Sequence, residues 1–174
     1  IKILSNKFSK SNFVKAHLKI DTGMGRLGVR YNDTENALKL IKEESSIHLE
    51  GLYSHFSTSN EIDTSYRDMQ LQKFNNAIML SKRILPNIKY FHIANSASVL
   101  NFKDSYYNMV RPGICLFGVS PLGLQYDYLK PVMQMSGPVI LIKNIKKGES
   151  IGYNRLFIAK ENSKIAIVQA GYAD

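Results

Sequence analysis

Residues 17–29 read HLKIDTGMGRLGV, which is the pattern of a β-strand that runs into a glycine-rich turn. Because successive side chains of a strand point to opposite faces, His17, Lys19 and Asp21 should share one face and the apolar residues between them the other. The glycines that follow permit backbone conformations that other residues avoid. Arg26 then stands just beyond the strand end, where βα folds place their chemistry. The stretch predicts either a functional strand end or a glycine-rich loop with solvated charges.

This strand belongs to a regular alternation of strands and helices. Apolar residues at helical spacing predict three helices, and apolar runs of strand length predict three further strands. The predicted helices cover residues 33–44, 64–85 and 96–100, and the predicted strands cover residues 14–20, 49–56, 90–94 and 109–117, the last interrupted by Pro112-Gly113. Repeated strand-helix units indicate an α/β domain with a parallel sheet. Four units cannot close an eight-stranded barrel, so the alternatives are a small open sheet or a barrel whose N-terminal half is absent from this chain.

The alternation stops after Gly118, and residues 119–130 have the composition of a linker. Short apolar runs at residues 139–142, 151–157 and 164–168, with a turn at Lys147-Gly148, predict an antiparallel β segment. We therefore expect an α/β domain over residues 1–125 and the start of a β domain over residues 126–174.

The composition is that of a globular chain. Of the 174 residues, 44% are hydrophobic and 21% are charged, which argues against disorder. No apolar run reaches the roughly 18 residues of a membrane-spanning helix, so no membrane partner is expected. The single cysteine, Cys115, cannot form an internal disulfide, which favours a reducing compartment such as the cytoplasm. The lack of an initial methionine, and the end of the chain soon after the apolar run 165–168, predict a fragment of a longer protein.

The net charge is +9, from 23 basic and 14 acidic residues, so a nucleic-acid partner has to be considered. The lysines are scattered, however, and the sequence has no Cys/His finger, RNP-type aromatic motif or basic helix. A lysine-rich solvated surface is therefore the preferred interpretation, and we predict no nucleic-acid partner and no metal site. Steep salt dependence of DNA binding would favour the alternative.

Two further strand ends carry polar side chains. Residues 51–57 read GLYSHFS and include His55, although a lone histidine on a strand is more often a packed core residue than a catalyst. Residues 91–97 read FHIANSA, where Asn95 and Ser96 stand at a predicted helix start. That position is typical of a helix cap. The N–H groups of a helix start also attract phosphate, so both interpretations stay open.

The remaining motifs lie later in the chain. Residues 110–118 read VRPGICLFG, and an arginine such as Arg111 inside a buried apolar strand needs a partner. Residues 171–174 read GYAD, in which Tyr172 follows a predicted strand and core packing is the simplest explanation.

Taken together and in this order, KIDTGMGRLGV, RPGI followed by LFG, and GYAD resemble the alanine racemases. These are pyridoxal 5'-phosphate enzymes with a TIM-like barrel and a C-terminal β domain. The resemblance implies that residues 1–125 are a partial cofactor-binding domain, the C-terminal half of a TIM-like (β/α)8 barrel. It implies that residues 126–174 are the first strands of the β domain. It also implies alanine as substrate and a homodimer with the active site at the interface.

The resemblance assigns catalytic and cofactor-binding roles to four residues around the glycine-rich turn and the later strands. Lys19 matches a lysine that is often carbamylated, and its carbamate would hold Arg26 by charge-assisted hydrogen bonds. Arg26 matches the arginine that reaches the cofactor's phenolic oxygen and the substrate carboxylate. Arg111 matches the arginine that faces the pyridine nitrogen. His55 matches the histidine that links this arginine to the catalytic tyrosine.

The phosphate and the proton transfer are assigned in the same way. Ser96 and the backbone N–H groups of Gly113 and Ile114 match the phosphate cup, with Asn95 beside it. Tyr172 matches the catalytic tyrosine, which works across a dimer interface on one face of the substrate α-carbon while a lysine works on the other. Racemisation needs two such groups, because one proton leaves one face and another arrives at the opposite face.

The implied function is the interconversion of L-alanine and D-alanine in the cytoplasm, which supplies D-alanine for cell-wall peptidoglycan. The lysine that carries the cofactor belongs to the first strand of the family's barrel, and no lysine here has its sequence context. We therefore expect these 174 residues alone to be inactive. The alternatives are a related racemase for serine or a broad range of amino acids, and a non-catalytic pyridoxal-phosphate barrel protein. The β segment and Tyr172 argue against the second.

Overall fold

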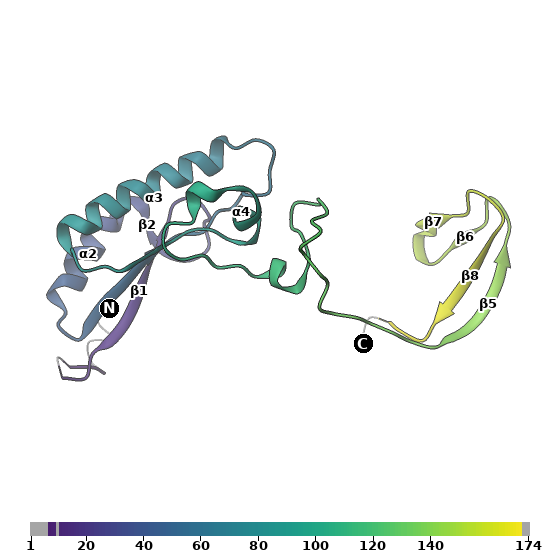
Figure 1. The fold of residues 1–174 in the computed structure, drawn as a ribbon, viewed down its shortest axis with the longest axis horizontal. Helices are drawn as coiled ribbons and strands as arrows, with labels where there is room; N and C mark the ends of the chain where they lie inside the picture. The colour runs from purple at the N-terminus through teal and green to yellow at the C-terminus, as the bar shows by residue number, and fades with distance from the viewer. Residues whose placement is uncertain (1–6, 10, 172–174) are drawn as a thin grey trace. The chain divides into compact units, whose positions relative to one another are not determined.

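The computed structural model describes residues 7–9 and 11–171, and the chain forms two compact units that divide between Val132 and Met133 (Figure 1). Among the described residues, no helix combines the length and the apolar character needed to cross a lipid bilayer.

The first unit contains a four-stranded sheet in which every neighbouring pair is parallel. Its strands lie in the order β2-β1-β3-β4. They are β1 (Val14–Asp21), β2 (Val29–Arg30), β3 (Ile47–Tyr53) and β4 (Tyr90–His92). The prediction of an α/β domain with a parallel sheet is therefore confirmed.

The helices of this unit are α2 (Thr34–Glu43), α3 (Ser65–Ile84) and α4 (Ser96–Asn101). The described part of this unit also contains the short 3-10 turns η1 (Tyr31–Asp33), η2 (Lys103–Ser105) and η3 (Ile114–Phe117). Helix α3 ends two residues before Pro86, because a proline disfavours helical geometry in the residue before it.

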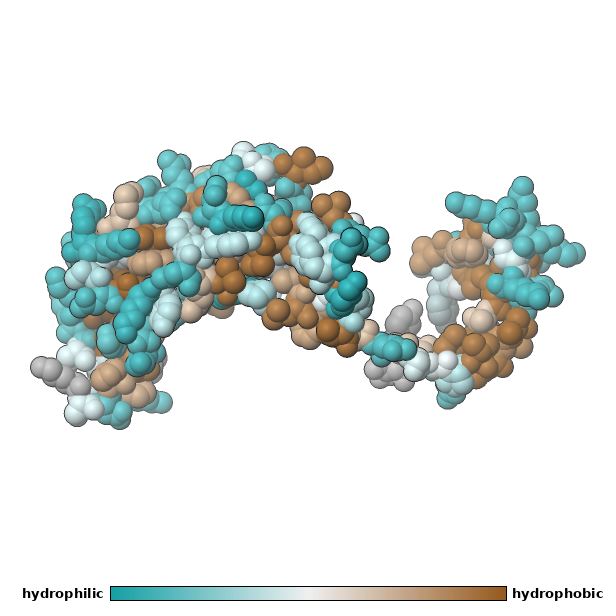
Figure 2. All heavy atoms as spheres, in the orientation of Figure 1, coloured by the Kyte–Doolittle hydropathy of each residue, from teal (hydrophilic) through white to brown (hydrophobic). Residues whose placement is uncertain are grey.

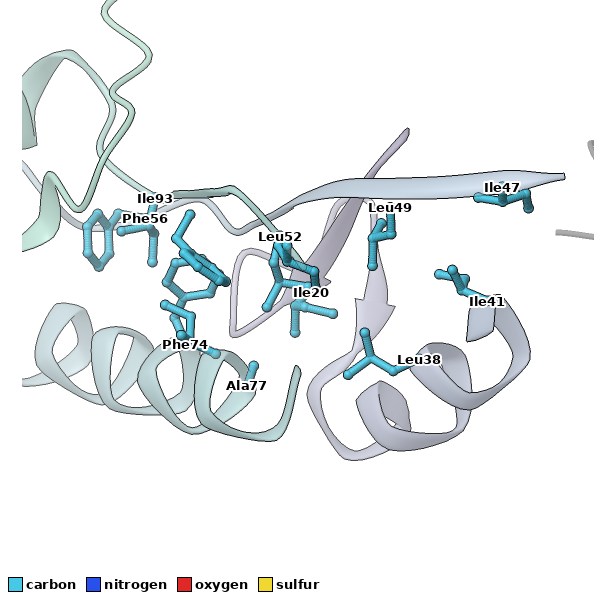
Figure 3. Close-up of a cluster of buried hydrophobic side chains, with 13 residues drawn as sticks. Ile20, Leu38, Ile41, Ile47, Leu49, Leu52, Phe56, Phe74, Ala77 and Ile93 are labelled. Atoms are coloured by element: carbon cyan, nitrogen blue, oxygen red, sulfur yellow. The ribbon is translucent and has the colours of Figure 1, made fainter. Parts of the chain in front are cut away.

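The core of this unit lies between the sheet and helices α2 and α3 (Figure 3). Ile20 and Leu52 point from the sheet into it, and Leu38 and Phe74 meet them from the helices (Figure 3). All four side chains are fully buried. The opposite face of the sheet is thereby left for the polar residues of the strands.

A register shift decides which residues of β3 lie on that opposite face. Ala16 pairs with Leu49, but the next residue, His17, pairs with Gly51, so Glu50 is one residue more than β1 can match. Such an insertion reverses the alternation of side chains beyond it. Gly51 consequently shares the face of His17 instead of the core.

The prediction of a strand over residues 109–117 was wrong. The Arg111 N–H group donates to Ala94 O at 3.1 Å, but Pro112 has no N–H group with which to continue a ladder. The chain instead turns into η3. Arg111 therefore lies beside the end of β4 and not inside a buried strand.

In residues 133–171 of the second unit, the strands form two antiparallel pairs. Strand β5 (Val139–Ile145) pairs with β8 (Ser163–Val168), and β6 (Ser150–Ile151) pairs with β7 (Phe157–Ile158). The predicted antiparallel character is confirmed, and so is the turn at Lys147-Gly148. Apolar side chains gather over β5 and β8 (Figure 2), where Val139, Ile140, Leu141 and Ile142 are at least half exposed.

The single strand predicted over residues 151–157 was wrong. The structure has a 3-10 turn, η4 (Tyr153–Arg155), between β6 and β7. Gly152, Asn154 and Arg155 have φ angles of 75°, 58° and 55°. Extended strands need negative φ, so three positive values in this short segment end one strand before the next begins.

The core predicts a large effect on stability at one position of α3. Replacing Phe74 by alanine should reduce the free energy of unfolding of the complete protein by about 3–5 kcal/mol, because Phe74 is 0% exposed. Met79→Ala on the same helix is the matched control, since Met79 is 60% exposed and should lose less than about 1 kcal/mol. Urea unfolding would measure both. Similar losses in the two variants would contradict the packing described here.

Candidate functional site

The carboxyl ends of β1, β3 and β4 meet at one edge of the sheet, because the three strands are parallel neighbours. Beside this edge lies a cavity of about 380 Å³. The sequence-predicted residues that line it are His55, Asn95, Ser96, Arg111, Gly113 and Ile114. Among the described residues that line the cavity, none is acidic. Its hydroxyl, amide, imidazole and guanidinium groups therefore favour an anionic ligand.

Arg111 is held by three acceptors at the inner end of this site. Its Nη2 donates to Ser54 O at 2.6 Å and faces His55 Nδ1 at 3.4 Å. Its Nη1 donates to His92 Nδ1. The guanidinium carbon lies 5.1 Å from the centre of the Tyr53 ring. The half-buried Arg111 thus has a carbonyl and two imidazoles as its hydrogen-bond partners. These contacts fix the planar guanidinium in one orientation.

Both histidines around Arg111 are strongly shifted toward the neutral form. Burial, followed by the positive charge of Arg111, lowers the pKa of His55 from 6.5 to about 4. The same two causes, with a further contribution from His17, lower the pKa of His92 from 6.5 to about 4. At neutral pH both rings are therefore uncharged and can accept hydrogen bonds from Arg111.

These two shifts predict how stability depends on pH. A histidine with a lowered folded-state pKa binds fewer protons in the folded than in the unfolded protein, so acid favours unfolding. The Tm of the complete protein should fall as the pH falls from 6.5 to about 4. The double variant His55→Gln and His92→Gln should lose less Tm over that window in scanning calorimetry. Equal losses in the variant and the parent protein would refute the assignment.

Lys19 also lies beside the Tyr53 ring. The ammonium group of Lys19 lies 5.9 Å from the centre of the Tyr53 ring. Burial lowers the pKa of Lys19, and the positive charges of Arg26 and Arg111 lower it further. Arg26 itself is exposed. The two arginines therefore favour an uncharged or anionic group at position 19.

Asp21 organises the glycine-rich turn. Its Oδ1 accepts hydrogen bonds from the N–H groups of Gly23 at 3.0 Å and Gly25 at 3.1 Å. Those backbone donors hold the pKa of Asp21 below its usual value. Asp21 therefore has a structural role: its carboxylate holds the glycine-rich turn in place.

The residues predicted for phosphate binding lie together at the start of α4. Ser96 Oγ accepts a hydrogen bond from the Gly113 N–H group at 2.7 Å, and Ile114 follows directly in the chain. Asn95 caps α4, since its Oδ1 accepts from the Ser98 N–H group at 3.2 Å. The same Oδ1 accepts from the Ser59 hydroxyl at 2.9 Å, so Asn95 ties a second loop to the helix start.

Three groups of this site were not predicted from the sequence. They are His92, which contacts Arg111; Tyr53, whose ring stacks on His92 at 4.9 Å; and Gln70, which is fully buried. Gln70 Nε2 donates to His55 O at 3.1 Å, and its Oε1 accepts from the Ser57 N–H group at 3.0 Å. Strand alternation could have found Tyr53 and His92, but the sequence contains no signal that joins Gln70 of α3 to this loop. The predicted Tyr172 lies outside the described residues.

Comparison with known proteins assigns both parts of the chain. Residues 3–121 match the family model described as alanine racemase, N-terminal domain, and residues 132–174 match that of the alanine racemase C-terminal domain. The alanine racemase of Citrifermentans bemidjiense is 39% identical over 163 residues, which is 91% of this chain and 43% of that protein. Alanine racemase 2 of Caldanaerobacter subterraneus is 41% identical over 170 residues, 95% of this chain and 43% of that protein.

Solved structures give the same result. An alanine racemase from E. faecalis has a TM-score of 0.74 and 33% identity over 99% of this chain and 47% of that chain. A Bacillus anthracis alanine racemase with bound L-Ala-P has a TM-score of 0.72 and 34% identity over 99% of this chain and 46% of that chain. A Bartonella henselae alanine racemase with covalently bound pyridoxal phosphate has a TM-score of 0.73 and 29% identity, over 99% of this chain and 46% of that chain. The chain spans less than half the length of these relatives.

Proposed function

The chain belongs to the alanine racemase family, and we propose that the complete protein interconverts L-alanine and D-alanine with pyridoxal 5'-phosphate at the sheet edge described above. In this proposal the parallel sheet is the C-terminal half of a TIM-like barrel. The β strands after the linker begin a second domain, with the boundary between residues 125 and 126.

The cavity beside the sheet edge is the observation that carries the proposal. Six residues that the sequence assigned to the site line one cavity, although they come from three separated segments. The cofactor's phosphate is an anion, and the described lining residues supply hydroxyl, amide and guanidinium donors without a carboxylate. The residues present therefore fit the group chemically.

The phosphate would be held at the start of α4. The Ser96 hydroxyl and the Gly113 N–H group, which lie 2.7 Å apart, are the proposed donors, together with the backbone N–H group of Ile114. The Gly113 N–H group, which donates to Ser96 Oγ in this structure, would donate to the phosphate instead, and the Ser96 hydroxyl would donate to it as well. Asn95 would position this loop through the bonds that it makes to Ser98 and Ser59.

Arg111 would face the pyridine nitrogen. A guanidinium does not give up its proton in a protein, so it can donate to the ring nitrogen but cannot protonate it. When bound, pyridoxal phosphate delocalises the negative charge that develops at the substrate α-carbon. An arginine at the nitrogen would moderate that delocalisation and so restrain side reactions such as transamination. The neutral His55 would connect Arg111 with the catalytic tyrosine.

The charges at Lys19 and Arg26 support a carbamate on Lys19. Carbon dioxide reacts with an uncharged amine, and the lowered pKa of Lys19 increases the uncharged fraction. The reaction of the uncharged amine forms an N–C bond, releases one proton and leaves an anion in place of a neutral group. That anion would orient Arg26 toward the substrate carboxylate and the cofactor's phenolic oxygen.

The remaining roles are proposed from the family alone. Tyr172 would exchange a proton at one face of the α-carbon from a neighbouring subunit of a homodimer. A lysine outside this chain would serve the opposite face and carry the cofactor. The buried, unpaired Cys115 accords with the cytoplasm as the proposed location.

The test is an assay of the complete protein with pyridoxal phosphate, L-alanine and L-serine, with product chirality measured by chromatography. We expect racemisation of alanine to be the faster reaction, and no turnover by residues 1–174 alone. Faster turnover of serine would favour a related racemase. A bound yellow cofactor without racemisation of any amino acid would favour a non-catalytic barrel protein.

A further inference from the structure

A chain of two imidazoles extends from Arg111 across the sheet. Arg111 Nη1 donates to Nδ1 of the buried His92 on β4. His92 Nε2 in turn lies 2.8 Å from Nδ1 of His17 on β1. The His17 ring also stacks on Tyr90, with 5.7 Å between ring centres. Strand β3 lies between β1 and β4, so the His17–His92 contact spans an intervening strand.

The chemistry of these groups sets the direction of each hydrogen bond. A guanidinium has donors only, so His92 Nδ1 must be the acceptor and carry no proton. The proton of the neutral ring is then on Nε2, which donates to His17. His17 Nδ1 must therefore also be an acceptor, and its own proton is on Nε2. One arginine thus determines the tautomers of two histidines.

Gly51 makes the contact across β3 possible. It pairs with His17 on one side and with Tyr90 on the other, and these two rings stack over it. A Cβ atom built at Gly51 would lie only 2.6 Å from His17 Cγ, a distance that side chains do not tolerate. Because the register shift at Glu50 turns residue 51 to this face, only a glycine leaves room for the His17 ring.

We propose that His17 is a positioning residue, which acts through His92 to hold the guanidinium of Arg111 in one orientation, and that Gly51 is required to let it do so. The inference rests on the proposed function only in that Arg111 is the group that faces the cofactor. The Nδ1 acceptor of His92 is occupied by Arg111, and its Nε2–H donor is occupied by His17. The His92 ring therefore cannot rotate without breaking both hydrogen bonds. Without His17, the Nε2–H group of His92 loses its acceptor, and the ring is free to adopt other orientations.

The test uses the complete protein with three variants. His17→Leu removes the acceptor, His17→Gln retains a side-chain oxygen that can accept, and Gly51→Ala displaces the ring. His48→Leu is the control, because His48 is an exposed histidine on β3. Nitrogen NMR of the imidazoles should find the proton of both His17 and His92 on Nε2 in the parent protein. His17→Leu and Gly51→Ala should give a mixture of His92 tautomers, which a merely structural residue would not change.

Kinetics provide the second measurement. His17→Leu and Gly51→Ala should lower kcat about tenfold with little change in KM, whereas His17→Gln and His48→Leu should stay near the parent value. Unchanged His92 tautomers in His17→Leu would overturn the inference even if the protein racemises alanine. The predicted tautomers in a protein without racemase activity would support the hydrogen-bond chain and reject the proposed function instead. A kcat loss in His17→Gln equal to that in His17→Leu would also overturn the inference.

Discussion

Arg111→Lys should lower the racemase kcat of the complete protein by about 10²–10³-fold, which is the effect of removing an oriented electrostatic group from an active site. Arg111 reaches Ser54 O and His92 Nδ1 with separate nitrogens of one planar fork, at 2.6 Å for the first. A lysine carries its charge on one nitrogen and cannot reproduce that geometry. The variant keeps the positive charge, so the decrease in kcat would measure the contribution of the guanidinium's orientation.

The control for this variant is Arg83→Lys, since Arg83 is an exposed residue in the last turn of α3. It should have the parent kcat. Arg111→Gln should lose at least as much activity as Arg111→Lys, because it removes both the charge and the fork. If Arg111→Lys kept the full kcat while its Tm was unchanged, the orientation of Arg111 would have no part in the reaction.

The regular elements could be predicted because their signals are local. The alternation around Lys19 locates β1, and the apolar spacing around Phe74 locates α3. The strand predicted over residues 109–117 shows the limit of such signals. Its apolar residues are typical of a strand, but Pro112 lacks the N–H donor that a strand in the sheet needs. A proline is tolerated in an edge strand, so the sequence alone does not decide between a strand and a turn here.

The site residues fall into two classes in the same way. His55 and Ser96 were predicted because they lie in short motifs at strand ends. His92 and Gln70 were not. Strand alternation could have placed His92 at the site, but no sequence signal shows its contact with Arg111, 19 residues away, or the contact of Gln70 with His55, 15 residues away. The register shift at Glu50 is a tertiary feature of the same kind, since simple alternation along β3 would place Gly51 with the core-facing Leu49.

Replacement of Lys19 should have the second large effect, and its size should depend on charge. Lys19→Met prevents formation of the proposed carbamate and should lower kcat/KM by about 10²-fold. Lys19→Glu places a carboxylate near the same two arginines that lower the pKa of Lys19, so it should retain more activity than Lys19→Met. Lys15→Met is the control on the same strand, because Lys15 lies near the amino end of β1 and pairs with Glu50 at 3.0 Å.

A carbamate also makes activity depend on dissolved carbon dioxide. The parent protein should lose activity in buffer freed of carbon dioxide and recover it when bicarbonate is added, whereas Lys19→Glu should respond to neither treatment. Isotope-labelled bicarbonate should give a carbamate signal in carbon NMR of the parent protein that Lys19→Met lacks. If Lys19→Met were more active than Lys19→Glu, an anion at position 19 would be unnecessary, and Arg26 would have to be oriented by its own exposed loop. The positive surroundings of Lys19 are what make that outcome unfavourable, since an ammonium there is repelled by both Arg26 and Arg111.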